Sequence, residues 1–547
     1  MRRALALAVV VALGAPAGAH AADGNAFLLS RAAGGGLPNG PSRAPVFSQD
    51  RQLGSRVAFE SDASDLVPDD ANGPVTDVFV AERSDWRSDG LRGLPWQRGG
   101  IRLVSRAAGG APANGRSFGA DVDGDQLHDG LSGRPRGRCV AFVSEASNLV
   151  PGDTNGLPDA FIADLKTGAV TRVSVDALGR QARGATYDVQ VDGGCSRVAF
   201  TSDARSLALT KATWKRAKRP PSWRPVVTTA PDPGQRQVYV RVIDPGQSLA
   251  GVDDPGQSLA GATFLASATG SVAANGPSYD VSLGKGDGCP STCEGTSGLA
   301  LAFTSEASNL SPRDSAGTPD VYRRTVIARP APRAKKGAKR PASPWAAPET
   351  RTDLVSFTPA GSAGNGPSGE PAIESRGRRV AFTTAASDVL PCTSLKAGEV
   401  CDTNGVSDVA EADFGGRKAR MFWVSASDAI GQPGNGASGN PVITRYGSVF
   451  FESEASNLQE RPFGTRGPDD RNGARDVFYW SEQFKRVSLY SHDSEDRPRT
   501  SAAPAVQPAT NAYNNYLVFA TADPRVDLTL PPGPGTQQIY LRYIGPR

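Results

Sequence analysis

The sequence is poor in the residues that many enzymes use for nucleophilic and metal chemistry. It has 3 histidines among 547 residues, and His20 lies in an N-terminal segment that we expect to be removed. His128 and His492 then remain, in separate polar stretches. A histidine-based triad and a multi-histidine metal site are therefore not expected. The sequence also has no Gly-Lys-Ser phosphate loop, no His-Glu-x-x-His motif and no dinucleotide-binding fingerprint. We predict no catalytic residues.

Long apolar runs and strong net charge are scarce as well. Met1-Arg-Arg3, an apolar run from Ala4 to Leu13 and small residues up to Ala21 form the order of a secretory signal peptide, predicted as residues 1–21. No later stretch approaches the roughly 20 apolar residues that span a bilayer. Loss of Arg2 and Arg3 lowers the formal net charge from +4 to about +2. We expect a secreted, periplasmic or cell-envelope protein with no transmembrane segment after signal removal and no specific nucleic-acid binding.

The 6 cysteines of an exported chain predict disulfides. Two pairs are close in sequence and could each close a local loop, and the remaining pair would then join successive repeats. Several connectivities stay open. Metal binding is the alternative, but the closest pair has no matching second pair at zinc-site spacing. The disulfide candidates are Cys289 with Cys293, Cys392 with Cys401, and Cys139 with Cys195.

What the sequence has in abundance is a repeated phrase. A Val-Ala-Phe run returns seven times, each time followed by a polar stretch and a second apolar run. Short β-branched and aromatic runs separated by Gly, Asn, Asp and Pro are typical of a sheet-forming unit that must stack on its neighbours. The copies are 57–59, 140–142, 198–200, 301–303, 380–382, 449–451 and 517–519.

The second repeat predicts four strands, at 117–122, 139–144, 159–165 and 170–175. Four-stranded antiparallel sheets repeated around an axis form a β-propeller. The last repeat ends at Arg547 without a fourth strand, whereas Phe27–Arg31 stands alone before the first repeat.

We therefore predict an all-β fold, a seven-bladed β-propeller of four-stranded antiparallel blades over residues 22–547. Phe27–Arg31 is expected to complete blade 7 by pairing with its third strand. The alternative is an open array with a frayed first strand.

The repeat phrases resemble a known family. The second repeat contains Val-Ala-Phe-x-Ser, Ala-Ser-Asn-Leu-x-Pro, Asp-Thr-Asn-Gly-x-x-Asp and Thr-Arg-Val-Ser in succession over residues 140–174. This pattern is similar to the TolB-type, WD-repeat-like propeller repeats of exported bacterial proteins. The resemblance implies a propeller that binds its partner through one loop-rich face.

The loops between second and third strands carry an Asp-x-Asn-Gly-x-x-Asp phrase. Oxygen ligands at alternate positions before a Gly suit Ca²⁺, although no copy has the closing Glu of an EF-hand. Asp and Asn also build Asx-turns without metal, so both interpretations stay open. Asp121-Val-Asp-Gly-Asp125 is a weaker match. The calcium candidates are Asp153, Asn155, Asp159, Asp402, Asn404, Asp408, Asp470, Asn472 and Asp476.

Other recurring segments are expected to be structural. An Asn-Gly-x-Ser phrase before five of the first strands predicts a tight turn, because Asn and Gly tolerate positive φ. Two basic, Pro-containing insertions near 211–236 and 329–349 are expected to be solvated loops, with contact to an anionic polymer as the alternative.

We predict an exported, non-catalytic propeller scaffold, expected to be a monomer, that binds a protein or glycan partner at the cell envelope. The alternative is a polysaccharide lyase or hydrolase that uses carboxylates of the loop-rich face, such as Glu145, Glu306 and Glu454.

Overall fold

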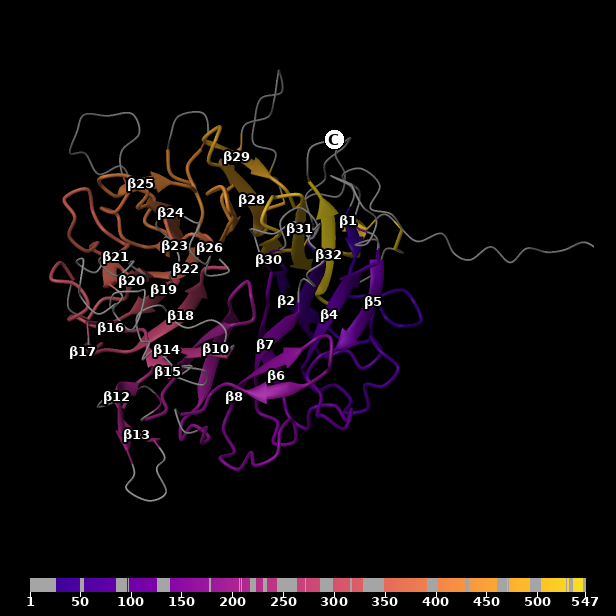
Figure 1. The fold of residues 1–547 in the computed structure, drawn as a ribbon. Coiled ribbons are helices and arrows are strands. Elements are labelled where there is room, and N and C mark those ends of the chain that lie inside the picture. The colour runs from indigo at the N-terminus through magenta and orange to yellow at the C-terminus, as the bar shows by residue number, and fades with distance from the viewer. Residues whose placement is uncertain are drawn as a thin grey trace, which may run out of the picture.

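The computed structural model shows seven four-stranded antiparallel sheets arranged around a central axis (Figure 1). The predicted all-β, seven-bladed β-propeller is confirmed. The structure describes residues 26–544 apart from 50–53, 85–95, 97, 125–137, 177–178, 206, 208, 217–222, 230–233, 244–262, 271, 286–298, 315–316, 328–348, 391–401, 428–431, 460–469, 471, 492–502, 528 and 531–534.

Each blade follows the chain from the axis outward. The strands of blades 1 to 3 are β2 (Ser42–Phe47), β3 (Arg56–Ser61), β4 (Asp77–Arg83) and β5 (Arg98–Leu103); β6 (Ser117–Val122), β7 (Cys139–Ser144), β8 (Asp159–Asp164) and β9 (Val170–Arg172); β10 (Thr186–Val191), β11 (Arg197–Ser202), β14 (Gln237–Val242) and β15 (Thr263–Leu265). Those of blades 4 to 6 are β18 (Ser278–Leu283), β19 (Ala300–Ser305), β20 (Asp320–Ile327) and β21 (Glu349–Leu354); β22 (Ser368–Ile373), β23 (Arg379–Thr384), β24 (Asp408–Asp413) and β25 (Arg420–Trp423); β26 (Ser438–Ile443), β27 (Val449–Ser453), β28 (Asp476–Ser481) and β29 (Arg486–Leu489). Blade 7 consists of β30 (Ala505–Thr510), β31 (Tyr516–Thr521), β32 (Gln538–Tyr543) and β1 (Ala26–Leu28).

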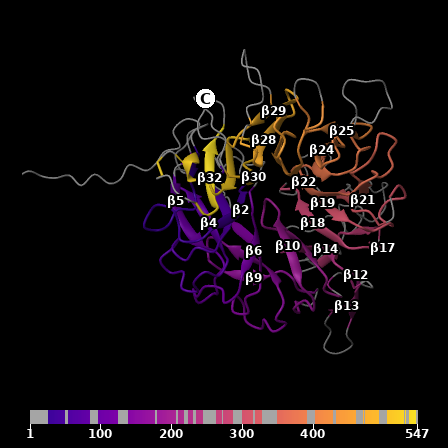
Figure 2. The same ribbon diagram turned by 180° about the vertical axis from the view of Figure 1, so that it is seen from behind.

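The first strands form the inner wall of the ring. Each of them contacts the first strand of the next blade, from β2 through β30 and back to β2. Figure 2 shows the same ring from behind. Loops that enter first strands and loops that join second to third strands lie on one face, here called the loop-rich face. Turns that join first to second and third to fourth strands lie on the opposite face.

The core lies between the blades, because each second strand is buried on both sides. In β3, Val57 and Phe59 belong to one hydrophobic cluster, whereas Ala58 belongs to the cluster on the other side of the sheet. Phe59 stacks on Phe79 of β4 with ring centroids 5.8 Å apart. The near-continuous apolar runs seen in the sequence are the consequence of burial on both faces.

The ring is closed by the N-terminal strand, as predicted. β1 pairs antiparallel with β32, and Leu28 lies opposite Tyr540. The Leu29 N–H donates to the Ile539 carbonyl at 2.8 Å, and Ser30 Oγ donates to Gln538 Oε1 at 2.9 Å.

The Ser30–Gln538 bond has an equivalent in each blade. In blade 2, Ser174 Oγ donates to Asp159 Oδ1 at 2.5 Å, so the first residue of the third strand holds the fourth strand in place. The closing strand is therefore fastened in the same way as a fourth strand that follows its blade in sequence. The other pairs are Asp77 with Ser105, Gln237 with Ser267, Asp320 with Ser356, Asp408 with Ser425, and Asp476 with Ser491.

Two expectations about loops need correction. In the basic insertion of blade 3, β12 (Leu209–Arg216) and β13 (Trp223–Thr229) pair as a hairpin, where a loop without strand pairing was expected. The β-branched run at 226–229 explains this pairing. Three further short elements are β16 (Ala268–Thr269), β17 (Val272–Ala273) and a single 3₁₀ turn at Pro524–Val526.

The Asn-Gly-x-Ser glycines are needed for close packing rather than for positive φ. A Cβ on Gly40 would lie 2.7 Å from the backbone nitrogen of Ala63. The preceding Asn39 closes the contact, because its Nδ2 donates to Ser64 Oγ at 3.0 Å while its Oδ1 accepts from the Ser64 N–H at 3.0 Å. The phrase thus fastens five of the first strands to the loop that follows the second strand.

Candidate functional site: the channel mouth

Each first strand is irregular near the loop-rich face. Its pairing with the second strand shifts register there, as between Arg43 and Val46 in blade 1. The third residue has a positive φ in every blade except blade 3, from 49° at Ala44 to 61° at Gly119. Such a bulge removes a backbone N–H from the ladder and redirects a side chain. The bulge residues are Ala44, Gly119, Asp280, Glu370, Asn440 and Gln507. In blade 3 the register shift falls at Tyr187, and Asp188, the third residue of β10, stays paired with Thr201.

Side chains of the preceding blade bind the freed N–H groups. Most acceptors are carboxylates, so the bulges place a ring of acidic groups at the mouth of the central channel. We call Glu60, Asp188, Asp280, Glu370, Glu452 and Gln507 the channel-mouth ring. Its hydrogen bonds run from Gly119 N–H to Glu60 (2.8 Å), Asn440 N–H to Glu370 (2.8 Å), Gln507 N–H to Glu452 (2.7 Å) and Ala44 N–H to Gln507 (2.7 Å). The Asp280 N–H acts on Asp188 and the Glu370 N–H acts on Asp280, and each favours the charged carboxylate and so lowers its pKa.

The ring is interrupted between blades 2 and 3, because blade 2 has Gly119 at the bulge and Val143 at the neighbouring position of its second strand. A disulfide joins these two blades instead. Cys139 in β7 bonds to Cys195 in the turn before β11, with Cα atoms 6.2 Å apart. It is the one disulfide found in the described part of the chain. It lies at the face opposite the loop-rich face.

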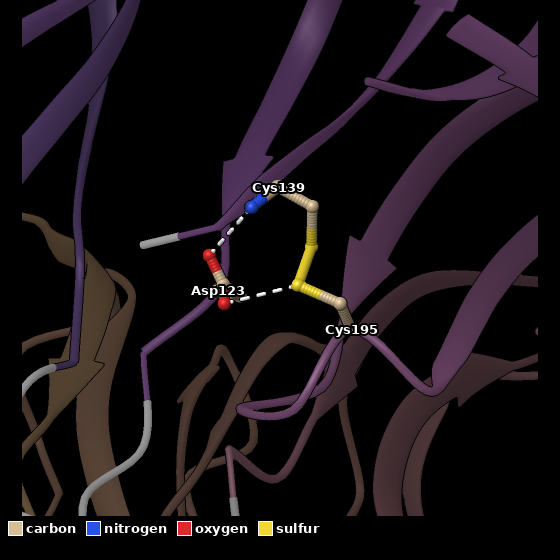
Figure 3. Close-up of side chains that lie close together, drawn as sticks. All are labelled: Asp123, Cys139 and Cys195. Carbon is tan, nitrogen blue, oxygen red and sulfur yellow. Dashed lines mark hydrogen bonds between the residues drawn. A yellow bond between two sulfur atoms is a disulfide. The ribbon is translucent and has the colours of Figure 1, made fainter. Parts of the chain in front are cut away.

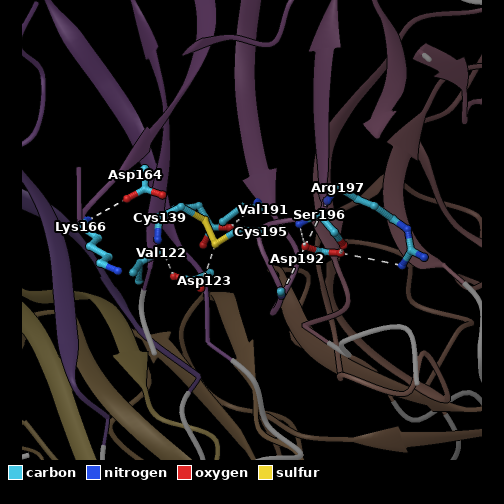
Figure 4. The surroundings of a disulfide bond; sticks show 12 residues. Val122, Asp123, Cys139, Asp164, Lys166, Val191, Asp192, Cys195, Ser196 and Arg197 are labelled. Carbon is cyan, nitrogen blue, oxygen red and sulfur yellow. Dashed lines mark hydrogen bonds and ion pairs between the residues drawn. A yellow bond between two sulfur atoms is a disulfide. The ribbon is translucent and has the colours of Figure 1, made fainter. Parts of the chain in front are cut away.

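Asp123 packs against this disulfide (Figure 3). Its Oδ1 accepts from the Cys139 N–H at 3.0 Å, and its Oδ2 lies 3.0 Å from Cys195 Sγ. These three residues are near enough together to hold a metal ion, but the two sulfurs are bonded to each other and offer no thiolate. The turn with Cys195 is held by Asp192, which accepts from the Ser196 N–H at 2.8 Å and Oγ at 2.6 Å (Figure 4).

The neighbouring Asp121 is also engaged in structure. Its Oδ2 accepts from the Val191 N–H at 2.7 Å and from the Lys285 ammonium. The structure describes two carboxylates of the weaker calcium match at 121–125. Asp121 is engaged by Lys285, and Asp123 is engaged by the cysteines of the disulfide.

Blades 3 to 5 carry adjacent acidic groups of the ring. Desolvation raises the pKa of Asp188 to about 6, and the nearby charge of Asp280 adds to the rise. Desolvation also raises the pKa of Asp280, and the charge of Glu370 acts in the same direction. The Arg236 guanidinium opposes both shifts. The side chains of Asp280 and Glu370 are exposed although they stand on the innermost strands, so they face the channel.

Aromatic hydroxyls flank these carboxylates. Arg236 lies over the Tyr187 ring, 3.6 Å from its centroid, and the Tyr187 hydroxyl donates to Asp203 at 2.9 Å. The Tyr279 hydroxyl donates to Glu306 at 3.1 Å, and desolvation with that acceptor raises the pKa of Tyr279 to about 12. This sector therefore combines acids, phenols and one guanidinium in a partly desolvated setting.

The three glutamates suggested for an enzyme do not form one constellation. Glu145, Glu306 and Glu454 lie on blades 2, 4 and 6, so no two of them are on neighbouring blades. Glu306 is bound by Tyr279, and Glu454 pairs with Arg475 at 2.7 Å.

The calcium candidates form Asx-turns. In blade 5, Asn404 Oδ1 accepts from the Val406 N–H at 3.0 Å, and Nδ2 donates to Asp408 Oδ2 at 3.0 Å. Asn155 in blade 2 and Asn472 in blade 6 make the same two bonds. Burial raises the pKa of Asp408 to about 6 and that of Asp476 to about 7, and a second nearby Asp contributes to each.

Blade 2 differs in the groups that contact its two Asp residues: Gln181 Nε2 donates to Asp153 at 2.8 Å and to Asp159 at 2.9 Å, and an arginine lies beside both. Arg172 places its guanidinium 3.4 Å from Asp153 Oδ2 and 3.7 Å from Asp159 Oδ2. The corresponding residues are Trp423 in blade 5 and Leu489 in blade 6, each one residue before the apolar–Ser pair of the fourth strand. The turn chemistry is observed, whereas calcium binding stays a prediction.

Sequence reasoning missed the channel-mouth ring. The signal was a polar residue two positions after the Ser of Asn-Gly-x-Ser, as Asp280 after Ser278 and Glu370 after Ser368. Strand alternation hides it, because the bulge changes which face these residues occupy.

Several predictions lie outside the described residues. These are the signal peptide at 1–21, His128 and His492, the basic insertion at 329–349 except for its last residue, and the cysteines Cys289, Cys293, Cys392 and Cys401. The described part of the chain contains no helix of the length and apolar character that a membrane crossing requires.

No family model matches the sequence, and no curated protein is significantly similar to it. Solved structures with a similar arrangement include oligogalacturonate lyase from Vibrio parahaemolyticus, at 10% identity over 96% of this chain and 99% of that chain, with a TM-score of 0.40. A putative TolB from Agrobacterium tumefaciens is 10% identical over 82% of this chain and 94% of that chain, with a TM-score of 0.32. The β-propeller domain of the Trilobed protease from Pyrococcus furiosus is 8% identical over 92% and 97%, with a TM-score of 0.36. None of these bears on what this chain binds.

Proposed function

We propose that this protein is an exported, non-catalytic propeller scaffold that binds a positively charged segment of a partner protein at the channel mouth. The observation that carries the proposal is the run of acidic groups in blades 3 to 5, where Asp188, Asp280 and Glu370 follow one another around the channel. A lysine or arginine side chain entering there would meet carboxylates in a partly desolvated site, where charge pairing is stronger than in water.

The distribution of arginines supports this location. On the other side of the mouth, Arg43 pairs with Glu60 and Asp62, and Arg475 pairs with Glu452 and Glu454. In blades 3 to 5, Arg236 is the guanidinium that acts on Asp188 and Asp280. The negative charge of that sector is therefore only partly balanced, which is the complement of a basic ligand.

The setting of the proposal is the cell envelope. The signal-peptide pattern and the resemblance of the repeats to TolB-type propellers support export and a protein partner. A mature chain that begins at Ala22, measured by mass spectrometry of the exported protein, is the expected result. A chain that retains residues 1–21 and remains inside the cell would contradict the export part of the proposal.

Charge-removing variants test the binding site. Asp280→Asn and Glu370→Gln keep an oxygen that can accept the next blade's N–H, so the ring geometry is retained while two negative charges are lost. We expect the double variant to bind a fluorescent lysine-rich peptide at least tenfold more weakly in anisotropy titrations. Glu82→Gln in β4, remote from the mouth, is the control and should leave affinity unchanged. Equal affinity for all three proteins would refute the proposed site.

The alternative is a polysaccharide-active enzyme. One observation favours it, because Asp188 with a pKa raised to about 6 next to Asp280 resembles the paired carboxyls of acid–base catalysis. Lyase and hydrolase assays on acidic and neutral polysaccharides distinguish the two functions. Turnover by the wild type that Asp188→Asn abolishes would establish the enzyme and reject the scaffold.

A further inference from the structure

A groove opens between blades 6 and 7 on the face opposite the channel mouth. Its volume is about 550 Å³, within the range of small-molecule sites. Three turns form it, and they contribute Tyr446 before β27, Phe484 between β28 and β29, and Asn514 before β31. Tyr479 and Tyr490 line its wall.

The rim of the groove exposes large aromatic rings. Phe484 is 68% exposed and Tyr446 is 54% exposed, the two largest exposures among aromatic residues in the described part of the chain. Tyr446 is braced edge-on by Tyr513, with ring centroids 5.4 Å apart. A ring that is held in place yet uncovered, as Tyr446 is, provides flat apolar surface at little further entropic cost.

The wall of the groove offers hydrogen-bonding groups beside these rings. Asn514 Nδ2 donates to the Tyr479 hydroxyl at 3.0 Å, which leaves the Tyr479 hydroxyl proton free to be donated to a ligand. Asn514 Oδ1 is buried and has no hydrogen-bond partner. Ser448 and Ser488 also line the groove. The Tyr479 hydroxyl and the two serine hydroxyls thus offer donors and acceptors beside the rings, which is the pattern that sugar hydroxyls satisfy.

The lining of the groove contains two charged residues, and one of them is paired. Glu482 is held by Arg379 and Lys485, both at 3.2 Å, so its carboxylate is already neutralised. Arg486 is the one further charged residue of the lining. A highly charged ligand would find no complementary cluster here.

We propose that this groove is a binding site for a neutral oligosaccharide, whose pyranose rings stack on Phe484 and Tyr446 while its hydroxyls bond to Tyr479 and to the serines of the wall. Aromatic surface next to paired donors and acceptors, with little net charge, matches the alternating apolar faces and hydroxyl edges of a pyranose. The site lies on the face opposite the channel-mouth ring and does not depend on the proposed protein partner.

Calorimetric titration of the mature protein with chitotetraose, cellotetraose, maltotetraose and mannotetraose tests the site. We expect at least one of them to bind, and Phe484→Ala and Tyr446→Ala each to weaken that binding by about tenfold, the loss of one stacking contact. Both rings are exposed, so these variants are expected to fold normally. Leu157→Ala, which removes an exposed apolar side chain from the loop-rich face, is the matched control and should bind as the wild type does.

Three results would overturn the inference. Either none of the four saccharides binds, or binding is equal in all variants, or a parallel titration shows that only polygalacturonate binds, which would indicate recognition through charge. The Asp280→Asn and Glu370→Gln variants should retain full saccharide binding. Failure at the groove is thus distinguishable from failure at the channel mouth.

Discussion

Cys139 and Cys195 are bonded across the junction between blades 2 and 3, where the described residues form no hydrogen bond of the channel-mouth ring. Four of the other junctions each have a hydrogen bond of the channel-mouth ring, and at the remaining two a backbone N–H acts on a ring carboxylate. The disulfide lies at this junction on the face opposite the loop-rich face, whereas the ring is interrupted there on the loop-rich face. The disulfide and the ring thus both connect neighbouring blades, and the junction of blades 2 and 3 is also joined by the hydrogen bond from the Val191 N–H to Asp121.

Removal of this disulfide should destabilise the propeller. The bond spans 56 residues of sequence, for which loop-closure entropy predicts a contribution of about 4 kcal/mol as an upper value. We expect Cys139→Ser with Cys195→Ser to lower the melting temperature by several degrees in calorimetry. The double variant is preferable to a reductant because it leaves the other four cysteines untouched. An unchanged melting temperature would show that the remaining contacts between the blades suffice.

Ring closure depends on the buried Leu29. Its side chain is 0% exposed and belongs to a cluster with Phe59 of blade 1 and Ile539 of blade 7. Leu29→Ala should cost about 2–5 kcal/mol, the usual range for a buried leucine. Urea unfolding measures this loss. Leu157→Ala, at an exposed leucine, should cost under about 0.5 kcal/mol. Similar values for both variants would mean that the N-terminal strand contributes little to closure.

The fold was predictable because its repeats carry redundant information. Three signals together specify seven blades and their closure: a Val-Ala-Phe run buried on both faces, an Asp or Gln that holds the fourth strand, and Leu28-Leu-Ser30, which lies at the N-terminus although it completes the last blade. Each signal is local, and each recurs often enough for an irregular copy to be recognised.

The candidate site was much less predictable. The bulge at Asp280 or Glu370 is imposed by packing between blades, and a regular strand pattern places these residues wrongly. The groove beside Phe484 is formed by three turns that are distant in sequence. The hairpin β12–β13 was missed because its basic residues resembled a solvated loop. Contacts of this kind arise only in the assembled ring.

Glu411 should make stability depend on pH. Its side chain is 0% exposed, and burial raises its pKa from 4.5 to about 8 although Arg379 and Lys485 favour the charged form. Asp413 and Glu482, the acids that face it, act in the opposite direction from these two cations. A carboxyl with a raised folded-state pKa favours folding fully below its unfolded pKa, and this advantage is lost as the pH rises through the folded value.

We therefore expect stability to fall between pH 4.5 and about 8. Glu411→Gln keeps the acceptor for Arg379 without the charge, so its advantage over the wild type should grow with pH across this window. Urea midpoints measured at pH 5, 6.5 and 8 give the comparison, and Glu82→Gln is the control. A constant difference between Glu411→Gln and wild type at all three pH values would contradict the raised pKa.

Blade 2 offers an internal control for the calcium prediction. Arg172 already supplies a positive charge to Asp153 and Asp159, whereas in blades 5 and 6 Trp423 and Leu489 stand at that position. If loops of this kind bind Ca²⁺, the ion should occupy blades 5 and 6 and be absent from blade 2, because a guanidinium and a divalent cation repel each other.

Terbium luminescence and melting temperature test this expectation on the intact mature chain. EDTA should lower the melting temperature of the wild type, since an ion that binds only the folded state stabilises it. Asp402→Asn with Asp470→Asn should abolish the luminescence, and Asp153→Asn should leave it unchanged. An identical melting temperature with and without EDTA would leave the Asx-turns of Asn404 and Asn472 as the complete explanation of these loops.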